Sequence, residues 1–246
     1  MVCDGLDDVR PWYPIPIQDC GEPLLDLPPQ LLRLEPHPYA RLGAPYGAGA
    51  SPFRLRQGVV ERLLAAQEEL ASRQKGWRLA IFDAWRPVAV QRFMVDHSIE
   101  AECAARGIDR HRPSAQRQAV IDAVGRLWAP PSADPATPPP HSTGAAVDLT
   151  LVDGEEAEVA MGSAIDALGD VSEPDHHRQL AMKLVPGPER DAALAFQRHR
   201  DLLRDVMDTA GFVRHPNEWW HFSWGDQLWA WRSGNAQAHY GRWLDA

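Results

Sequence analysis

The sequence predicts an α+β fold in which a mainly antiparallel central sheet is flanked by helices. Helical patterns alternate with several short strands, and some neighbouring strands are joined by connections of hairpin length. The 246 residues can bury a sizeable core within one domain, and no linker or internal repeat divides them. We therefore expect a single compact domain over residues 1–246, with the segment 1–56, which is rich in proline and glycine, packed on it.

The first regular elements are expected after that segment. Apolar residues at helical spacing predict an amphipathic helix over 57–74. Residues 77–82 then alternate in the manner of a short strand, which places residues 83–86 at its end. A helix over 88–106 follows a proline, which the first turn of a helix tolerates, and a third helical pattern covers 114–128.

The middle of the chain is expected to contain a proline-rich loop, a buried strand and an irregular segment, in that order. Residues 129–140 include six prolines, each without a backbone N–H donor, so this stretch is expected to be a loop. The loop leads directly to His141, and residues 145–151 then predict a buried strand that carries Asp148. Residues 154–188 show no regular period and are expected to be irregular.

The last part of the chain predicts one long helix and a pair of strands. The helix is expected over 189–209, and Gly211 is a natural cap after it. Residues 212–214 and 219–223 predict strands around a turn at 215–217. This arrangement completes an antiparallel sheet with helices packed against it.

Composition excludes several classes of protein. The net charge of −9 argues against nucleic-acid binding, which is typical of proteins with a basic face. The acidic N-terminus lacks the apolar region of a signal peptide, and no stretch approaches the ~20 apolar residues of a membrane helix. Cys3, Cys20 and Cys103 are too scattered for a disulfide framework, which is typical of free thiols in a reducing compartment. We expect a cytoplasmic protein without a membrane partner.

Two short segments, far apart in the chain, carry the most informative residues. His141, Asp148 and His221 supply two imidazoles and a carboxylate, a donor set that catalytic zinc uses when it keeps its fourth position for water. His141 and Asp148 are seven residues apart, which suits a loop followed by a strand and not one helix face. Structural zinc usually has close cysteine pairs, and none is present. We expect one Zn²⁺ per chain.

Two further residues suggest catalysis. Glu218 lies three residues before His221, so both side chains can point into one site, where the carboxylate could act as a general base. Arg86 could face the negative charge that develops on a carbonyl oxygen, a contribution whose loss typically costs ~100- to 1000-fold in rate. Together these residues predict a zinc metallopeptidase.

Other polar and aromatic residues allow two interpretations. Asp166 is either a turn carboxylate or the partner of a substrate ammonium. We expect His176 and His177 to be an exposed loop pair, and His215 to be a turn residue. Five tryptophans near the last ligand are expected to form core or pocket wall, with carbohydrate stacking as the alternative: Trp219, Trp220, Trp224, Trp229 and Trp231.

At these residues the chain resembles the D-alanyl-D-alanine dipeptidases, the VanX type of zinc peptidase. The resemblance rests on residues 81–87, 141–151, 161–166 and 218–222. It implies a compact α+β fold and a small closed pocket that admits a dipeptide and excludes longer peptides. The roles that it implies are zinc binding by His141, Asp148 and His221, acid/base catalysis by Glu218, transition-state stabilisation by Arg86, and substrate binding by Asp166 and Ser163.

Two departures from the family pattern concern substrate contacts and leave the metal ligands intact. Pro139 stands where the family often has serine, and Ile165 stands where an aromatic residue commonly precedes the aspartate. The expected reaction is hydrolysis of D-alanyl-D-alanine, or a related small D,D-dipeptide, in wall-precursor turnover or nutrient use. A peptidoglycan D,D-carboxypeptidase or endopeptidase is the alternative. A non-catalytic, hedgehog-like zinc module is disfavoured because Glu218 and Arg86 are both present. The oligomeric state is open.

Overall fold

The computed structural model describes residues 10–47 and 50–244. The acidic N-terminus with Cys3, and the end of the glycine-rich loop 43–49, lie outside the described residues. Within the described part, no helix is long and apolar enough to cross a membrane. Cys20 is exposed and Cys103 is buried, and both are free thiols, as expected from their spacing.

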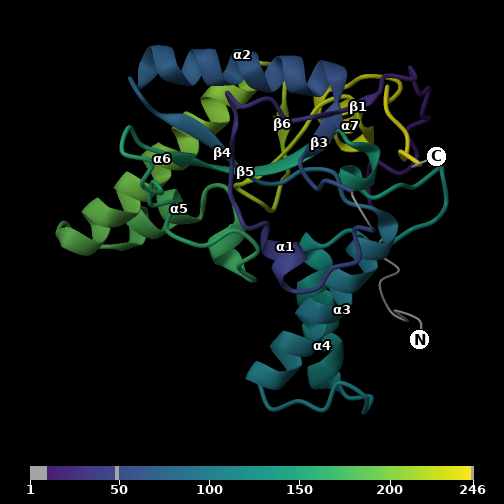
Figure 1. Ribbon diagram of the computed structural model, residues 1–246. Coiled ribbons are helices and arrows are strands. Elements are labelled where there is room, and N and C mark those ends of the chain that lie inside the picture. Colours follow the sequence, from purple (N-terminus) through teal and green to yellow (C-terminus); the bar gives the residue numbers. More distant parts are fainter. Residues whose placement is uncertain (1–9, 48–49, 245–246) are drawn as a thin grey trace.

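A five-stranded sheet forms the centre of the molecule, in the order β2-β4-β5-β7-β6 (Figure 1). All neighbouring strands in it are antiparallel except β2 and β4, which are parallel. The expected, mainly antiparallel sheet is thus a mixed sheet with one parallel pair at its edge. Its strands are β2 (Leu32–Arg33), β4 (Arg78–Asp83), β5 (Ala146–Val152), β6 (Val213–Arg214) and β7 (His221–Ser223).

The two faces of the sheet have different partners. Helices α2 (Gln57–Arg73) and α6 (Pro188–Thr209) contribute buried apolar residues to one core with the sheet (Figure 1). Val147, Leu149 and Leu151 of β5 belong to that core. Because side chains alternate along a strand, the residues between them, Asp148 and Thr150, point to the opposite face. The sheet therefore carries its apolar core on one side and its polar site on the other.

A second, smaller core lies on the side of that polar face. Helices α3 (Val88–Ala105) and α4 (Ala115–Leu127) pack together there and extend away from the sheet, with α1 (Pro38–Arg41) between them and the strands (Figure 1). Tyr39 of α1 and Trp128, which follows α4, are both buried in this core. The helices expected over 57–74, 88–106, 114–128 and 189–209 are thus confirmed, with small shifts at their ends.

Several short elements are not predicted by the sequence. In the N-terminal segment, β1 (Leu24–Asp26) and β3 (Arg54–Arg56) form a separate antiparallel pair. A 3₁₀ turn, η2 (Asp170–Ser172), and helix α7 (Gln227–Ser233) also appear. These elements are too short to show a clear hydrophobic period, and they form because tertiary contacts stabilise them.

The expected irregularity of residues 154–188 is wrong in part, because α5 (His176–Lys183) lies within them and packs against α6. The expected exposed loop pair is wrong for the same reason. His177 lies in the first turn of α5, is only 5% exposed, and packs its ring against Phe196 at a centroid distance of 5.1 Å. A β-carbon on Gly162 would overlap its imidazole, so His177 fills the space beneath the segment that carries Asp166.

Candidate metal centre and active site

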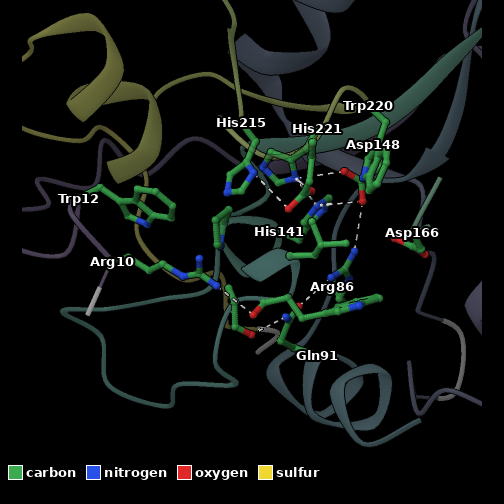
Figure 2. A pocket seen from close by; sticks show the side chains of 15 residues that line it. Arg10, Trp12, Arg86, Gln91, His141, Asp148, Asp166, His215, Trp220 and His221 are labelled. Carbon is green, nitrogen blue, oxygen red and sulfur yellow. Dashed lines mark hydrogen bonds and ion pairs between the residues drawn. The ribbon is translucent and has the colours of Figure 1, made fainter. Parts of the chain in front are cut away.

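Three buried side chains converge on one point of the polar face of the sheet (Figure 2). His141 Nε2 lies 3.2 Å from His221 Nδ1 and 3.2 Å from an oxygen of Asp148, and His221 Nδ1 lies 3.0 Å from the other oxygen. One ligand atom from each residue lies within 4.8 Å of the other two. Two imidazoles and one carboxylate are a donor set that fits zinc with a position left for water.

Strand register brings two of these ligands together. Asp148 of β5 is the direct partner of His221 in the antiparallel ladder with β7, and of Asp83 in the ladder with β4. The β4–β5 register shifts between Ile81 and Asp83, which indicates a β-bulge at the end of the strand. Bulges re-aim side chains beside functional sites. Asp83, Asp148 and His221 thus form one row across strands β4, β5 and β7.

The third ligand, His141, comes from the short 3₁₀ helix η1 (Pro140–Thr143) before β5. Gly144 ends η1 in a left-handed conformation, with φ of 72°. A β-carbon at that position would lie 2.2 Å from Leu24 Cδ2, so glycine is required by backbone and space together. The loop after β4 holds η1 in place, since Arg86 N–H donates to the His141 carbonyl and Ser142 Oγ donates to the Arg86 carbonyl.

Hydrogen bonds on the outer side of each imidazole orient its metal-facing nitrogen. His141 Nδ1 lies 2.7 Å from the Ala84 carbonyl, which can only accept, so Nδ1 carries the proton and Nε2 presents a lone pair. The Ser223 hydroxyl donates to Asp226 at 2.8 Å and lies 3.3 Å from His221 Nε2. Ser223 therefore accepts from His221 Nε2, which leaves Nδ1 free to bind a metal. Both tautomers suit zinc.

Glu218 lies in the turn before β7 and is 6% exposed. One of its oxygens is 3.7 Å from His221 Nδ1, and the other is 3.2 Å from His215 Nδ1. Burial raises the pKa of Glu218 well above its ordinary value, and the charges of Asp148 and Asp166 add to the rise. A carboxyl group with a raised pKa, placed beside the ligand cluster, is suited to exchange protons.

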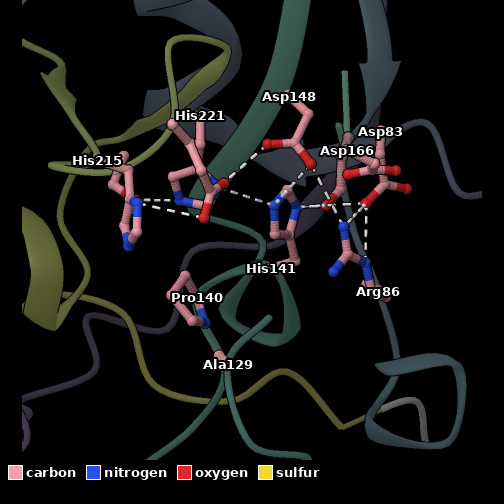
Figure 3. A network of polar contacts seen from close by, with 12 residues as sticks. Asp83, Arg86, Ala129, Pro140, His141, Asp148, Asp166, His215 and His221 are labelled. Carbon is pink, nitrogen blue, oxygen red and sulfur yellow. Dashed lines mark hydrogen bonds and ion pairs between the residues drawn. The ribbon is translucent and has the colours of Figure 1, made fainter. Parts of the chain in front are cut away.

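Arg86 borders the cluster beside Asp148, on the side away from His215, and is held by a dense polar network (Figure 3). Its guanidinium donates to Asp83 at 2.7 and 3.0 Å, to Gln91 at 2.8 Å and to Asp148 at 3.3 Å. Burial is the largest single influence and opposes the charged form, but Asp83, Tyr39 and Asp148 together outweigh it and keep the pKa of Arg86 above its ordinary value. Arg86 is therefore a permanent cation beside the ligands.

Comparisons with known proteins agree with this geometry. The model of the D-Ala-D-Ala dipeptidase family, Peptidase M15, matches residues 33–239. A D-alanyl-D-alanine dipeptidase of Synechocystis is 44% identical over 242 residues, which cover 95% of this chain and 97% of the relative. The chain belongs to the D-Ala-D-Ala dipeptidase family. All residues of the ligand cluster, with Glu218 and Arg86, lie inside the matched range.

Other relatives are more distant. The D-alanyl-D-alanine dipeptidase of Enterococcus faecium is 28% identical over 171 residues, which cover 67% of this chain and 69% of the relative. A Zn(II) complex of a mutant VanY D,D-pentapeptidase has a TM-score of 0.42 at 16% identity, covering 76% of this chain and 83% of that one. The LdcB LD-carboxypeptidase has a TM-score of 0.44 at 12% identity, covering 90% of this chain and 76% of that one.

Of the two residues expected to contact the substrate, Asp166 lines the pocket beside the metal ligands and Ser163 does not. Asp166 lines the pocket beside the ligands, and Tyr39 O–H donates to its carboxylate at 2.8 Å. Burial, followed by the charge of Asp148, raises the pKa of Asp166 to about 7. Among the described residues that line the pocket, Ser163 is absent. Its hydroxyl instead accepts hydrogen bonds from Trp219 Nε1 at 2.9 Å and from Arg200 at 3.1 Å, and neither of these two residues lines the pocket.

Several of the described pocket residues are not predicted as such by the sequence, among them Arg10, Trp12 and His215. Arg10 and Trp12, from the N-terminal segment, line the cavity together with His215 (Figure 2). His215 lies in the turn between β6 and β7, as expected, but it is also 4% exposed, contacts Glu218, and lies edge-on to Trp12 at 5.8 Å. Burial and the neighbouring charges of His221 and Arg10 lower its pKa. The spacing of His215 and Glu218, three residues apart, is the one local signal of this contact.

Proposed function

We propose that this chain hydrolyses D-alanyl-D-alanine, or a related small D,D-dipeptide, to free amino acids with one zinc ion. The observation that carries the proposal is the meeting of His141, Asp148 and His221 in a buried pocket that Glu218 and Arg86 also line. Membership of the D-Ala-D-Ala dipeptidase family supports the substrate class. The small volume of the pocket, about 460 Å³, supports a short substrate.

Each residue has a distinct role in the proposal. Zinc held by His141, Asp148 and His221 would supply Lewis-acid activation of water and of the scissile carbonyl. Glu218 takes a proton from the attacking water and returns it to the leaving amine. Arg86 faces the negative charge that develops on the carbonyl oxygen, and its contacts with Asp83 hold it in place before substrate arrives.

Asp166 is proposed to bind the substrate ammonium. It lies in the pocket next to the ligands, and its backbone adopts a left-handed conformation with φ of 64°, which aspartate tolerates better than most residues. The Tyr39 hydroxyl fixes the orientation of its carboxylate. Ser163, expected among the substrate contacts, is proposed to act indirectly. Its hydroxyl accepts a hydrogen bond from Trp219 Nε1 and so helps to position that side chain.

The decisive test is release of free D-alanine from D-Ala-D-Ala by the zinc-loaded protein. L-Ala-L-Ala and a pentapeptide that ends in D-Ala-D-Ala serve as comparison substrates. Turnover of the D,D-dipeptide alone supports a dipeptidase with a closed pocket. Cleavage of the pentapeptide would instead assign the chain to the D,D-carboxypeptidases, and no turnover of any substrate by protein with stoichiometric zinc would reject the proposal.

We also propose that the protein acts in the cytoplasm. Among the described residues, Cys20 and Cys103 are free thiols, one of them exposed, which is typical of a reducing compartment. Fractionation of cells that express the full chain tests this, with recovery in the cell envelope or medium as the contrary result.

A further inference from the structure

Asp166 belongs to a loop with little regular structure of its own. Residues 161–173, all of which the structure describes, form no strand, and their one helical element is the short turn η2 near the end of the loop. Asp166 itself has a left-handed backbone, with φ of 64°, a conformation that persists only where the surrounding structure enforces it. The position of its carboxylate in the pocket therefore depends on contacts that hold the whole loop.

One guanidinium group joins the two ends of this loop. Arg200 of α6 is 0% exposed, and its Nε donates to the Met161 carbonyl at 2.8 Å, at the start of the loop. At the end of the loop, Nη1 donates to the Glu173 carbonyl at 2.9 Å and Nη2 to the Val171 carbonyl at 3.0 Å. Nη2 also donates to the Ser163 hydroxyl at 3.1 Å. Because a guanidinium presents its donors in a rigid plane, it fixes the separation of these two ends.

The same guanidinium connects the loop to the turn that carries Glu218. It lies over the ring of Trp219 at 5.1 Å, and Trp219 directly follows Glu218 in the chain. Trp219 contributes two hydrogen bonds to the loop, from its backbone N–H to the Ser172 carbonyl at 3.0 Å and from Nε1 to the Ser163 hydroxyl at 2.9 Å. Arg200 therefore lies where the loop of Asp166 meets the turn of the general base.

Arg200 places a charged group inside the protein, where a charge costs free energy unless hydrogen bonds compensate for its lost hydration. Leu203, Val206 and Met207 on the buried face of α6 are apolar core residues. An apolar side chain in place of Arg200 would avoid the cost of burying a charge. It would also leave the carbonyls at both ends of the loop without these donors, so the guanidinium is explained by the loop that it holds.

We propose that Arg200 is a positioning residue, which closes the 161–173 loop and thereby holds Asp166 where it binds the substrate ammonium group. Arg200 is not among the described residues that line the pocket, so its effect on the substrate passes through the loop. This inference rests on the proposed function and deepens it, because it names the residue that maintains the ammonium site.

The test uses Arg200→Lys and two substrates. Lysine keeps the charge but carries its donors on one nitrogen, which cannot reach both ends of the loop. D-Ala-D-Ala is compared with propionyl-D-Ala, which differs from it only in lacking the ammonium group. The variant should raise KM for D-Ala-D-Ala about 10-fold, change kcat less, and lower the preference for D-Ala-D-Ala by a similar factor. Bound zinc, measured by elemental analysis, should be unchanged.

A double-mutant cycle distinguishes action through Asp166 from general destabilisation. Asp166→Asn already removes the charge that binds ammonium, so adding Arg200→Lys to it should lower kcat/KM for D-Ala-D-Ala much less than Arg200→Lys does alone. Ser163→Ala removes one acceptor of Arg200 without altering the buried charge, and should lower the preference for D-Ala-D-Ala about 2- to 5-fold. This second variant tests the proposal even if Arg200→Lys fails to fold.

Arg56 provides a matched control in another part of the structure. It is 1% exposed, and its guanidinium also joins distant backbone carbonyls, those of Glu22 at 2.6 Å, Thr143 at 2.8 Å and Gly241 at 3.0 Å. None of these lies in residues 161–173, so Arg56→Lys should keep the wild-type preference for D-Ala-D-Ala over propionyl-D-Ala, whatever its effect on stability.

Two results would overturn the role of Arg200 while leaving the dipeptidase assignment intact. One is a wild-type preference for D-Ala-D-Ala in the folded Arg200→Lys and Ser163→Ala proteins, or an equal loss of preference in Arg56→Lys. The other is a strictly additive double-mutant cycle with Asp166→Asn. Failure of the zinc-loaded wild-type protein to cleave D-Ala-D-Ala would overturn both the role of Arg200 and the proposed function.

Discussion

Asp148 and His221 are direct cross-strand partners in the β5–β7 ladder, and their side chains meet at 3.0 Å on its polar face. They are 73 residues apart in the chain. Because successive side chains of a strand point to opposite faces, a shift of one residue in either strand would send one ligand into the apolar core. The metal site and the sheet register are therefore specified together.

Replacing Glu218 by glutamine should separate metal binding from turnover. The Glu218→Gln protein should keep zinc, because the ligand cluster is intact, and lose about 100- to 10,000-fold in kcat, because no general base remains. Elemental analysis and D-alanine release measure the two effects. In His221→Ala, by contrast, zinc and activity should disappear together, and full activity of Glu218→Gln would show that another group moves the proton.

Ser223→Ala should weaken zinc binding without removing a ligand. The hydroxyl links His221 Nε2 to Asp226, so its loss leaves the imidazole less firmly oriented. We expect a decrease of about 10-fold in zinc affinity, measured by competition with a chelator. Ser172→Ala is the matched control, since Ser172 is also buried and its hydroxyl donates to the Gly169 carbonyl. Equal affinities in the two variants would contradict the role of Ser223.

Asp166 should shape the pH dependence of substrate capture. Burial is the main cause that raises the pKa of Asp166 from 3.8 to about 7. The carboxyl group is therefore neutral below about pH 7 and anionic above it. The anion is needed to bind an ammonium group, so kcat/KM should fall as the pH drops toward and below that value. Asp166→Asn, which tolerates the same backbone conformation, should have low kcat/KM at all pH values and lack this acid limb. Identical acid limbs in the two pH–rate profiles would exclude Asp166.

His215 should act on the rate through Glu218. His215→Phe keeps an aromatic ring against Trp12 but removes the nitrogen that lies 3.2 Å from the Glu218 carboxyl. Loss of that contact should lower kcat about 10-fold through poorer positioning of the carboxyl group. Zinc content and KM should stay close to the wild type. An unchanged kcat at matched thermal stability would mean that His215 only fills space.

Gly144→Ala should destabilise the fold beside the metal centre. The substitution meets both a left-handed backbone and the Leu24 side chain, and should cost about 2–4 kcal/mol in the free energy of unfolding. Gly107 has a similar φ of 64° but no neighbour within 4 Å of a β-carbon, so Gly107→Ala should cost only about 1–2 kcal/mol. Urea unfolding of both variants measures the difference, and equal losses would remove the collision as a cause.

The elements with strong local patterns agree with the sequence-based expectations. Helix α2 shows its apolar stripe over many turns, and β5 is a continuous buried run bounded by turn residues. Short elements such as α5 and α7 were not predicted, because a helix of two turns shows little hydrophobic periodicity and depends on tertiary packing. The parallel pairing of β2 with β4 involves only two residues of β2, too few to leave a pattern.

By itself, the sequence determined the chemistry that the site can perform and the local structure that carries it. Imidazole and carboxylate donors at a spacing suited to loop and strand, with a carboxylate three residues before the last ligand, are local properties that residue types record directly. Only the tertiary structure decided which other side chains line the pocket. Arg10, Trp12 and His215 meet at the pocket because segments more than 200 residues apart in the chain pack together, and no local pattern encodes such a contact.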